Sequence, residues 1–191
     1  MSITKPGERK LQILQALAGM LENPKGEKIT TAALAAKIDV SEATLYRHFA
    51  SKAQMFEGLI EFIESSVFGL INQISQEHQG LAQAHAISMM LLSFAERNPG
   101  MTRVLIGDAL VNEDERLQVR MNQFVDRIEL AYKQALRQAG VSGQVPEQEI
   151  TSRANLLVSY VLGRWQRFAK TGFKALPVDG ASAQLAVLLA A

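Results

Sequence analysis

The stretch from Ile29 to Lys52, ITTAALAAKIDVSEATLYRHFASK, constrains the fold more than any other part of the chain. Within it, pairs of apolar residues stand four positions apart, first in one half and then in the other. This spacing places each pair on one face of a short helix. The pairs are Leu34 with Ile38 and Leu45 with Phe49. The stretch therefore predicts two short helices joined by a turn, each with one apolar face.

Small polar residues predict where each of these two helices begins. A hydroxyl from Thr30 or Thr31 would accept a hydrogen bond from an unpaired N–H in the first helix. Ser41 would cap the second helix in the same way, and Glu42 follows in the first turn, where a helix favours an acid. The intervening Asp39 and Val40 form the turn, because aspartate tolerates the left-handed backbone. The two helices and their turn predict a helix-turn-helix.

The second helix of the pair would show small, polar and basic groups to a partner. Turning Leu45 and Phe49 inward leaves Ala43, Thr44, Arg47 and His48 facing outward, with Tyr46 at the edge. Such a helix fits the major groove of DNA. Two short helices joined by a turn are common, so ordinary surface roles for these side chains stay an alternative at this point. Residues 1–53 hold eight basic and five acidic side chains, a modest basic excess that coincides with the helix pair.

The rest of the chain predicts an all-α protein without strands. Helical spacing of apolar residues predicts a first helix from about Glu8 to Glu22, stopped by Asn23-Pro24-Lys25-Gly26. Ser51-x-x-Gln54 is a capping box that opens a long fourth helix. Further helices are expected over about 81–97, 101–111, 113–139, 150–170 and from 179 onward, and Gly100 is expected to reverse the chain.

Composition excludes several functional classes. The chain has no Cys, so disulfides, thiolate metal sites and Cys nucleophiles are absent. The three His lie in different predicted elements, and no nucleophile elbow or phosphate-binding glycine loop occurs. We expect neither enzyme activity nor a cofactor or metal. No run of about 18 apolar residues suggests a membrane span, and we expect a cytoplasmic protein.

The run SEATLYRHFASK resembles the signature of the TetR family of transcriptional regulators. Further segments resemble one branch of that family, the nucleoid occlusion factors. They are QILQALAGMLE, ITTAALA, MFEGLIEFIE, FAERNPGMTRVL, RLQVRMNQFVDRIE and FKALPVD, and they extend from Gln12 to Asp179. The chain departs from the expected pattern at Asp39, where Gly is usual, at Ala50, where Pro is usual, and at Leu70, where the branch has Arg.

The resemblance implies a helix-turn-helix DNA-binding domain of three helices over residues 1–53. It also implies a helical dimerisation and partner-binding domain over residues 54–191. The homodimer would form through the two C-terminal helices, with contacts from Leu157, Val161, Trp165 and the run Leu185 to Leu189. Ordinary packing within one chain stays the alternative. The protein would be associated with the nucleoid, and further assembly of dimers on DNA stays open.

Site residues follow from the same resemblance. Double-stranded DNA would be bound by Arg9, Lys10, Thr30, Ser41, Ala43, Thr44, Tyr46, His48 and Lys52. The partner is expected to be the tubulin-like division protein FtsZ, bound through Phe62, Met90, Ser93, Arg97 and Asn98. The implied function is inhibition of division-ring assembly over the chromosome. The alternative is a repressor that responds to a small molecule held in an apolar cavity of the C-terminal domain.

Overall fold

The structure is a computed structural model that describes residues 7–23 and 29–190. Within these ranges the chain is helical and contains no strand, as the sequence predicts. The α-helices are α1 (Glu8–Leu21), α2 (Thr31–Lys37), α3 (Glu42–His48), α4 (Lys52–Glu77), α5 (Gly80–Arg97), α6 (Pro99–Leu105), α7 (Glu115–Val141), α8 (Ile150–Lys170) and α9 (Ala181–Leu188). Two short 3₁₀ helices, η1 (Asp108–Leu110) and η2 (Glu147–Glu149), lie between them. The expected stop at residues 24–26 lies outside the described ranges.

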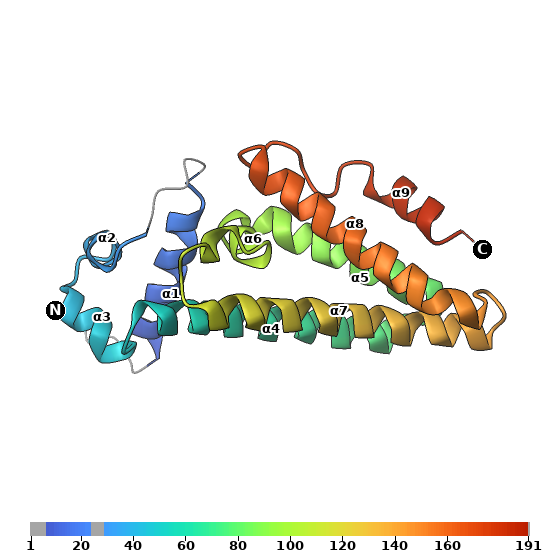
Figure 1. Cartoon of the computed structure of the whole chain (residues 1–191), viewed down its shortest axis with the longest axis horizontal. Helices are drawn as coiled ribbons and strands as arrows, with labels where there is room; N and C mark the ends of the chain where they lie inside the picture. Colours follow the sequence, from blue (N-terminus) through green and yellow to red (C-terminus); the bar gives the residue numbers. More distant parts are fainter. Residues whose placement is uncertain (1–6, 24–28, 191) are drawn as a thin grey trace.

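The molecule has two parts that share α4 (Figure 1). Helices α1, α2 and α3 gather at one end and form what we call the reading head. The long helix α4 leads away from it along α7, while α5 and α8 form the opposite side of an elongated helical body. Helix α6 lies where the body meets α1, and α9 packs on the outside against α5 and α8.

The predicted caps of the reading head are confirmed. The Thr30 hydroxyl accepts a hydrogen bond from Ala33 N at 3.1 Å, and the Ser41 hydroxyl accepts one from Thr44 N at 3.2 Å. Each cap satisfies an N–H that the first turn of a helix leaves unpaired. Asp39 has a φ of 54°, so it takes the left-handed conformation that the turn was predicted to need.

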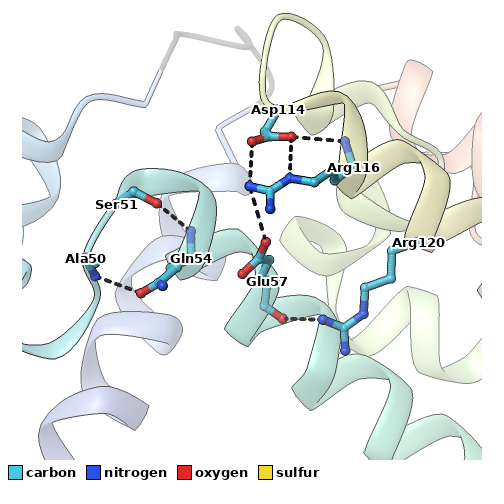
Figure 2. A network of polar contacts seen from close by, with 7 residues as sticks. All are labelled: Ala50, Ser51, Gln54, Glu57, Asp114, Arg116 and Arg120. Carbon is cyan, nitrogen blue, oxygen red and sulfur yellow. Dashed lines mark hydrogen bonds and ion pairs between the residues drawn. The ribbon is translucent and has the colours of Figure 1, made fainter.

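The start of α4 is capped from both sides (Figure 2). Ser51 Oγ accepts from Gln54 N at 3.1 Å, and Gln54 Oε1 in turn accepts from Ala50 N at 2.8 Å. This is close to the predicted capping box, with the reciprocal bond reaching one residue further back. The cap fixes the direction in which the chain leaves α3 and enters the body.

Large aromatic side chains fill the centre of the body. Phe124 and Tyr132 on α7 and Trp165 on α8 are fully buried, and the Phe124 ring contacts Phe68 on α4 edge-on. Their polar atoms have partners: the Tyr132 hydroxyl lies 2.7 Å from Ser88 Oγ, and Trp165 Nε1 donates to Leu91 O at 3.1 Å. Buried polar groups of this kind cost stability unless they are paired, so these bonds fix how α7 and α8 pack against α5.

Two expectations for the segment after α5 are wrong. The helix expected over 101–111 instead begins at Pro99 and ends at Leu105, because Gly107 adopts a left-handed φ of 76° and a 3₁₀ turn follows. Gly100 does not reverse the chain. It lies inside α6, where a Cβ would stand 2.0 Å from Ala18 O, so its role is to let α6 approach the backbone of α1.

Candidate nucleic-acid interface

Helix α3 presents a polar surface at the end of the molecule. Leu45 is buried, whereas Ala43 and Arg47 are exposed and Tyr46 retains 47% of its accessible surface. Thr44 and His48 are half-buried, so His48 faces outward less fully than the sequence predicts. The four-residue spacing of Leu45 and Phe49 accounts for this division, since both side chains pack on the core behind the helix.

Hydrogen bonds order the exposed residues of α3. Thr44 Oγ1 lies 3.0 Å from Ser41 Oγ and accepts from Arg47 Nη2 at 2.9 Å. The Thr44 side chain is therefore held in one orientation at the first turns of the helix, where a recognition helix contacts bases. Arg47 faces outward, as the sequence predicts, but it is not among the predicted site residues. Its spacing of three from Thr44 was the signal that could have added it.

A second set of contacts joins α2 to α3. Thr31 Oγ1 donates to Glu42 Oε2 at 2.5 Å, and Tyr46 Oη donates to Thr31 Oγ1 at 3.5 Å. These bonds connect residues 11 and 15 positions apart and fix the start of α2 beside the exposed face of α3. Thr30, one residue earlier, is exposed at the same place. The structure thus brings Thr30, Ser41, Thr44 and Tyr46 together, as the resemblance implies.

The predicted basic residues flank this surface. Lys10 on α1 is exposed, and its Nζ lies 5.6 Å from the centre of the Phe49 ring at the end of α3. Arg9 is half-buried, with Nη1 donating to Gln12 Oε1 at 2.6 Å. Lys10 therefore lies beside the end of α3.

Lys52, the first residue of α4, has an acidic partner within the chain. Its Nζ forms an ion pair with Glu113, which lies 61 residues away in the segment before α7. The two side chains are only 21% and 14% exposed, and Lys52 Nζ also lies 5.6 Å from the centre of the Phe56 ring. This pair could not be predicted, because no local pattern links two residues that are 61 positions apart.

The predicted partner residues lie on α4 and α5. Phe62 retains 41% of its surface, and it borders a hollow of about 290 Å³ together with Asn98. Apolar side chains complete the hollow, which is also lined by Leu11, Leu14, Leu59 and Met101 and by Gln15. Met90, Ser93 and Arg97 follow one another at helical spacing on α5, which places them on one stripe of that helix.

The two residues at the end of α5 differ in their surroundings. Arg97 is the last residue of the helix and is exposed, so both a role at the helix C-terminus and a role in partner binding remain available to it. Asn98 is half-buried, and its Nδ2 donates to Phe94 O at 2.7 Å. That bond satisfies one of the carbonyls that the helix end leaves unpaired.

Most of the side chains expected at a dimer interface are instead buried within a single chain, so this prediction needs a correction. Leu157, Val161, Trp165 and Leu185 are at most 1% exposed within a single chain, because they pack in the core of the body. Leu189 is also buried, at 8%. The large apolar residues that α8 and α9 leave exposed are Leu156, at 54%, and Val187, at 77%, the second of which lies within the expected run Leu185 to Leu189. Helical spacing alone could not distinguish these two faces, since α8 carries apolar residues on both.

Among the described residues, no group of three or more His, Asp or Glu is arranged to hold a metal ion. In the same part of the chain, no helix combines the length and the hydropathy that crossing a membrane requires.

Two family models match the chain. The model described as "Bacterial regulatory proteins, tetR family" matches residues 27–59, and the model for the "Tetracyclin repressor-like, C-terminal domain" of SlmA-like proteins matches residues 78–190. The chain is 50% identical over 184 residues to the nucleoid occlusion factor SlmA of Idiomarina loihiensis, covering 94% of this chain and 93% of that protein. It is 48% identical over 183 residues to SlmA of Vibrio cholerae, covering 93% and 92%.

Solved structures share the fold at low sequence identity. The FadR regulator of Bacillus subtilis in complex with stearoyl-CoA has a TM-score of 0.76 at 13% identity, over 94% of this chain and 97% of that one. AibR in complex with isovaleryl coenzyme A and operator DNA has a TM-score of 0.74 at 16% identity, over 95% and 98%. At such identities the likeness concerns the helical fold alone.

Proposed function

The chain belongs to the TetR family and, within it, to the nucleoid occlusion factors SlmA, and from that premise we propose that it binds specific DNA sites as a homodimer and engages FtsZ. Bound along the chromosome, it would keep a division ring from assembling over unsegregated DNA. The observation that carries the DNA-binding part is the ordered polar surface of α3, where Ser41, Thr44 and Arg47 form one hydrogen-bonded row.

Base reading and phosphate binding divide between two parts of this surface. Thr44 stands in the first turns of α3, where side chains reach base edges, so it would contribute to sequence discrimination. Lys10 and Lys52 lie at the margins, one beside the end of α3 and one at the start of α4. They would meet phosphates, which supply affinity that does not depend on sequence.

Two substitutions test this division. Thr44→Val keeps the shape of the side chain and removes the hydroxyl, and it should cost on the order of 1 kcal/mol of discrimination at one base pair. Lys52→Gln, whose amide can still donate to Glu113, should weaken binding equally on all sequences. It should also lower the slope of log affinity against log salt by about one unit for each reading head. Unchanged affinity and discrimination in both variants would show that the docking geometry is wrong.

For the homodimer, we propose the face of α8 and α9 that carries Leu156 and Val187. Both residues are large, apolar and exposed in the single chain, and a two-fold interface would bury each of them twice. Leu156→Asp should therefore yield a folded monomer that binds operator DNA poorly, because one head contacts only a half-site. Light scattering measures the mass, and circular dichroism checks the fold. Val161→Asp serves as the contrast, since a charge at that buried position should unfold the body.

For FtsZ, we propose the surface formed by Phe62, Met90, Ser93, Arg97 and Asn98. The exposed Arg97 offers a planar fork of donors suited to a carboxylate, and the apolar hollow beside Phe62 offers room for an apolar side chain. Arg97→Asp should abolish FtsZ binding in a sedimentation assay and leave operator affinity and dimer mass unchanged. If FtsZ binding persists and only about 1 kcal/mol of stability is lost, the role of Arg97 is to stabilise the C-terminus of α5 and not to bind FtsZ.

The interior of the body supports this interpretation over a repressor that responds to a small molecule. A ligand site in a body of this kind needs an apolar cavity of about 300–1,000 Å³ with a few converging polar groups. Here Phe124, Tyr132 and Trp165 are fully buried, and the polar atoms of Tyr132 and Trp165 are hydrogen-bonded to Ser88 and Leu91. A hollow between α6, α7 and α8 measures about 210 Å³ and opens to solvent, so it is small for such a ligand. Two larger hollows of about 490 Å³ each are lined by several charged side chains, among them Arg116 and Arg120 in one and Arg103, Asp108 and Lys170 in the other, so neither is the apolar cavity that this alternative requires.

A further inference from the structure

The ion pair between Lys52 and Glu113, which joins α4 to the segment before α7, differs from the charged contacts between α4 and α7 themselves. Further along this seam the acids belong to α4 and the guanidinium groups to α7. Arg116 Nη2 lies 4.0 Å from Glu57 Oε1, and Arg120 Nη2 lies 2.7 Å from Glu64 Oε2. At the end of the seam nearest the reading head the order is reversed, with the cation on α4.

The seam does not depend on the reversed pair. Arg120 also donates to the backbone oxygen of Glu57 at 3.4 Å, and the Ser51–Gln54 cap holds the first turn of α4 (Figure 2). These contacts would remain if Lys52 and Glu113 separated. The pair can therefore open without detaching α4 from α7.

The position of Lys52 explains why it has an acidic partner in the free protein. It is the first residue of a helix of 26 residues, where the helix dipole disfavours a cation. The Glu113 carboxylate compensates this charge in a place that is largely screened from solvent. A DNA phosphate at the same place would compensate it equally well, and the two anions would repel each other.

We propose that Glu113 sets the operator affinity of this protein by competing with a DNA phosphate for Lys52. The proposal rests on the proposed DNA-binding function, in which Lys52 contacts the backbone. Each reading head must exchange a carboxylate for a phosphate when it docks, which lowers the affinity of the free dimer. In this proposal Glu113 does not contact DNA itself, and it affects binding only through its ion pair with Lys52.

The test is an operator titration of the full-length protein at fixed salt with Glu113→Gln. Removing the competing charge should tighten binding about two- to fivefold per head, the range expected for one partly exposed ion pair, and about four- to 25-fold for a dimer. Glu115→Gln is the matched control, because it removes one exposed charge two residues away. It should change affinity less than Glu113→Gln does.

A double-mutant cycle separates competition from a general change in charge. In the Lys52→Gln background, the gain from Glu113→Gln should shrink to that of Glu115→Gln. An equal gain in both backgrounds would overturn the proposal, and so would weaker binding by Glu113→Gln, since the carboxylate would then be orienting Lys52 for the phosphate. If Lys52→Gln alone leaves binding and its salt dependence unchanged, Lys52 does not contact a phosphate, and the proposed docking geometry is wrong.

A structure of the unmodified protein on its operator provides a second measurement that does not depend on how the variants fold. The proposal requires Lys52 Nζ to contact a phosphate and to lie beyond ion-pair distance from Glu113. An intact Lys52–Glu113 pair in that complex would overturn it.

Discussion

Gly100 is a position where one added methyl group should have a large structural effect. It lies inside α6, and a Cβ there would stand 2.0 Å from the carbonyl oxygen of Ala18 and 2.9 Å from its carbonyl carbon. The obstacle is the backbone of α1, which cannot move aside as a flexible side chain would. Gly100→Ala must therefore separate α6 from α1.

Two effects of opposite sign set the magnitude. Alanine in place of glycine inside a helix stabilises it by up to about 1 kcal/mol. Overpacking against a fixed neighbour costs about 1–3 kcal/mol, and a contact this short belongs at the upper end of that range. We therefore expect Gly100→Ala to lose about 2 kcal/mol of unfolding free energy. Operator affinity should fall as well, because α1 packs against both α2 and α3.

Gly19 provides a matched control on the other side of the same contact. It belongs to α1, next to Ala18, and nothing lies within 4 Å of a Cβ built there. Gly19→Ala should gain about 0.5–1 kcal/mol from helix propensity alone. Urea denaturation at one fixed protein concentration measures both variants, since the stability of a dimer depends on concentration. If Gly100→Ala proves as stable as the unmodified protein, the close approach of α6 to α1 is wrong.

Two further predictions concern polar groups. Ser88→Ala should cost about 1–3 kcal/mol of unfolding free energy, because it leaves the buried Tyr132 hydroxyl unpaired. Tyr132→Phe should cost only about 1 kcal/mol, since Ser88 Oγ still donates to Ala84 O. The midpoints of urea denaturation compare the two variants. Hydrogen bonds from Arg116 lower the pKa of Asp114 to about 2. Its contribution to stability should be complete above about pH 4 and lost as the pH falls toward 2, so the stability advantage over Asp114→Asn should vanish in acid.

The reading head could be predicted from the sequence because its determinants are local. The hydroxyls of Thr30 and Ser41 cap N–H groups three residues further along, and Leu45 is one helical turn from Phe49. Interactions over three or four residues are visible in the sequence itself. This is why the caps and the turn at Asp39 were predicted correctly, together with the exposure of Ala43 and Arg47 on α3, whereas Thr44 and His48 are half-buried.

The environment of a residue in the body depends on partners that are distant in the sequence. Leu156 and Val161 on α8 are both apolar, yet one is exposed and the other is in the core, because α5 and α7 cover only one face of the helix. The role of Gly100 also depends on a distant partner, although the sequence predicts that this glycine reverses the chain. Its actual role depends on Ala18, a residue 82 positions earlier in a different helix.

The sequence by itself determined the helical architecture, the helix-turn-helix and, through its resemblance, the family. Helix spacing and capping depend on neighbouring residues, and a family signature is a property of the chain alone. Only the tertiary structure decided which apolar face of α8 is buried and that Lys52 is paired with Glu113. Packing contacts and ion pairs between distant residues form only when the helices assemble. They therefore cannot be predicted from the spacing of residues along the chain.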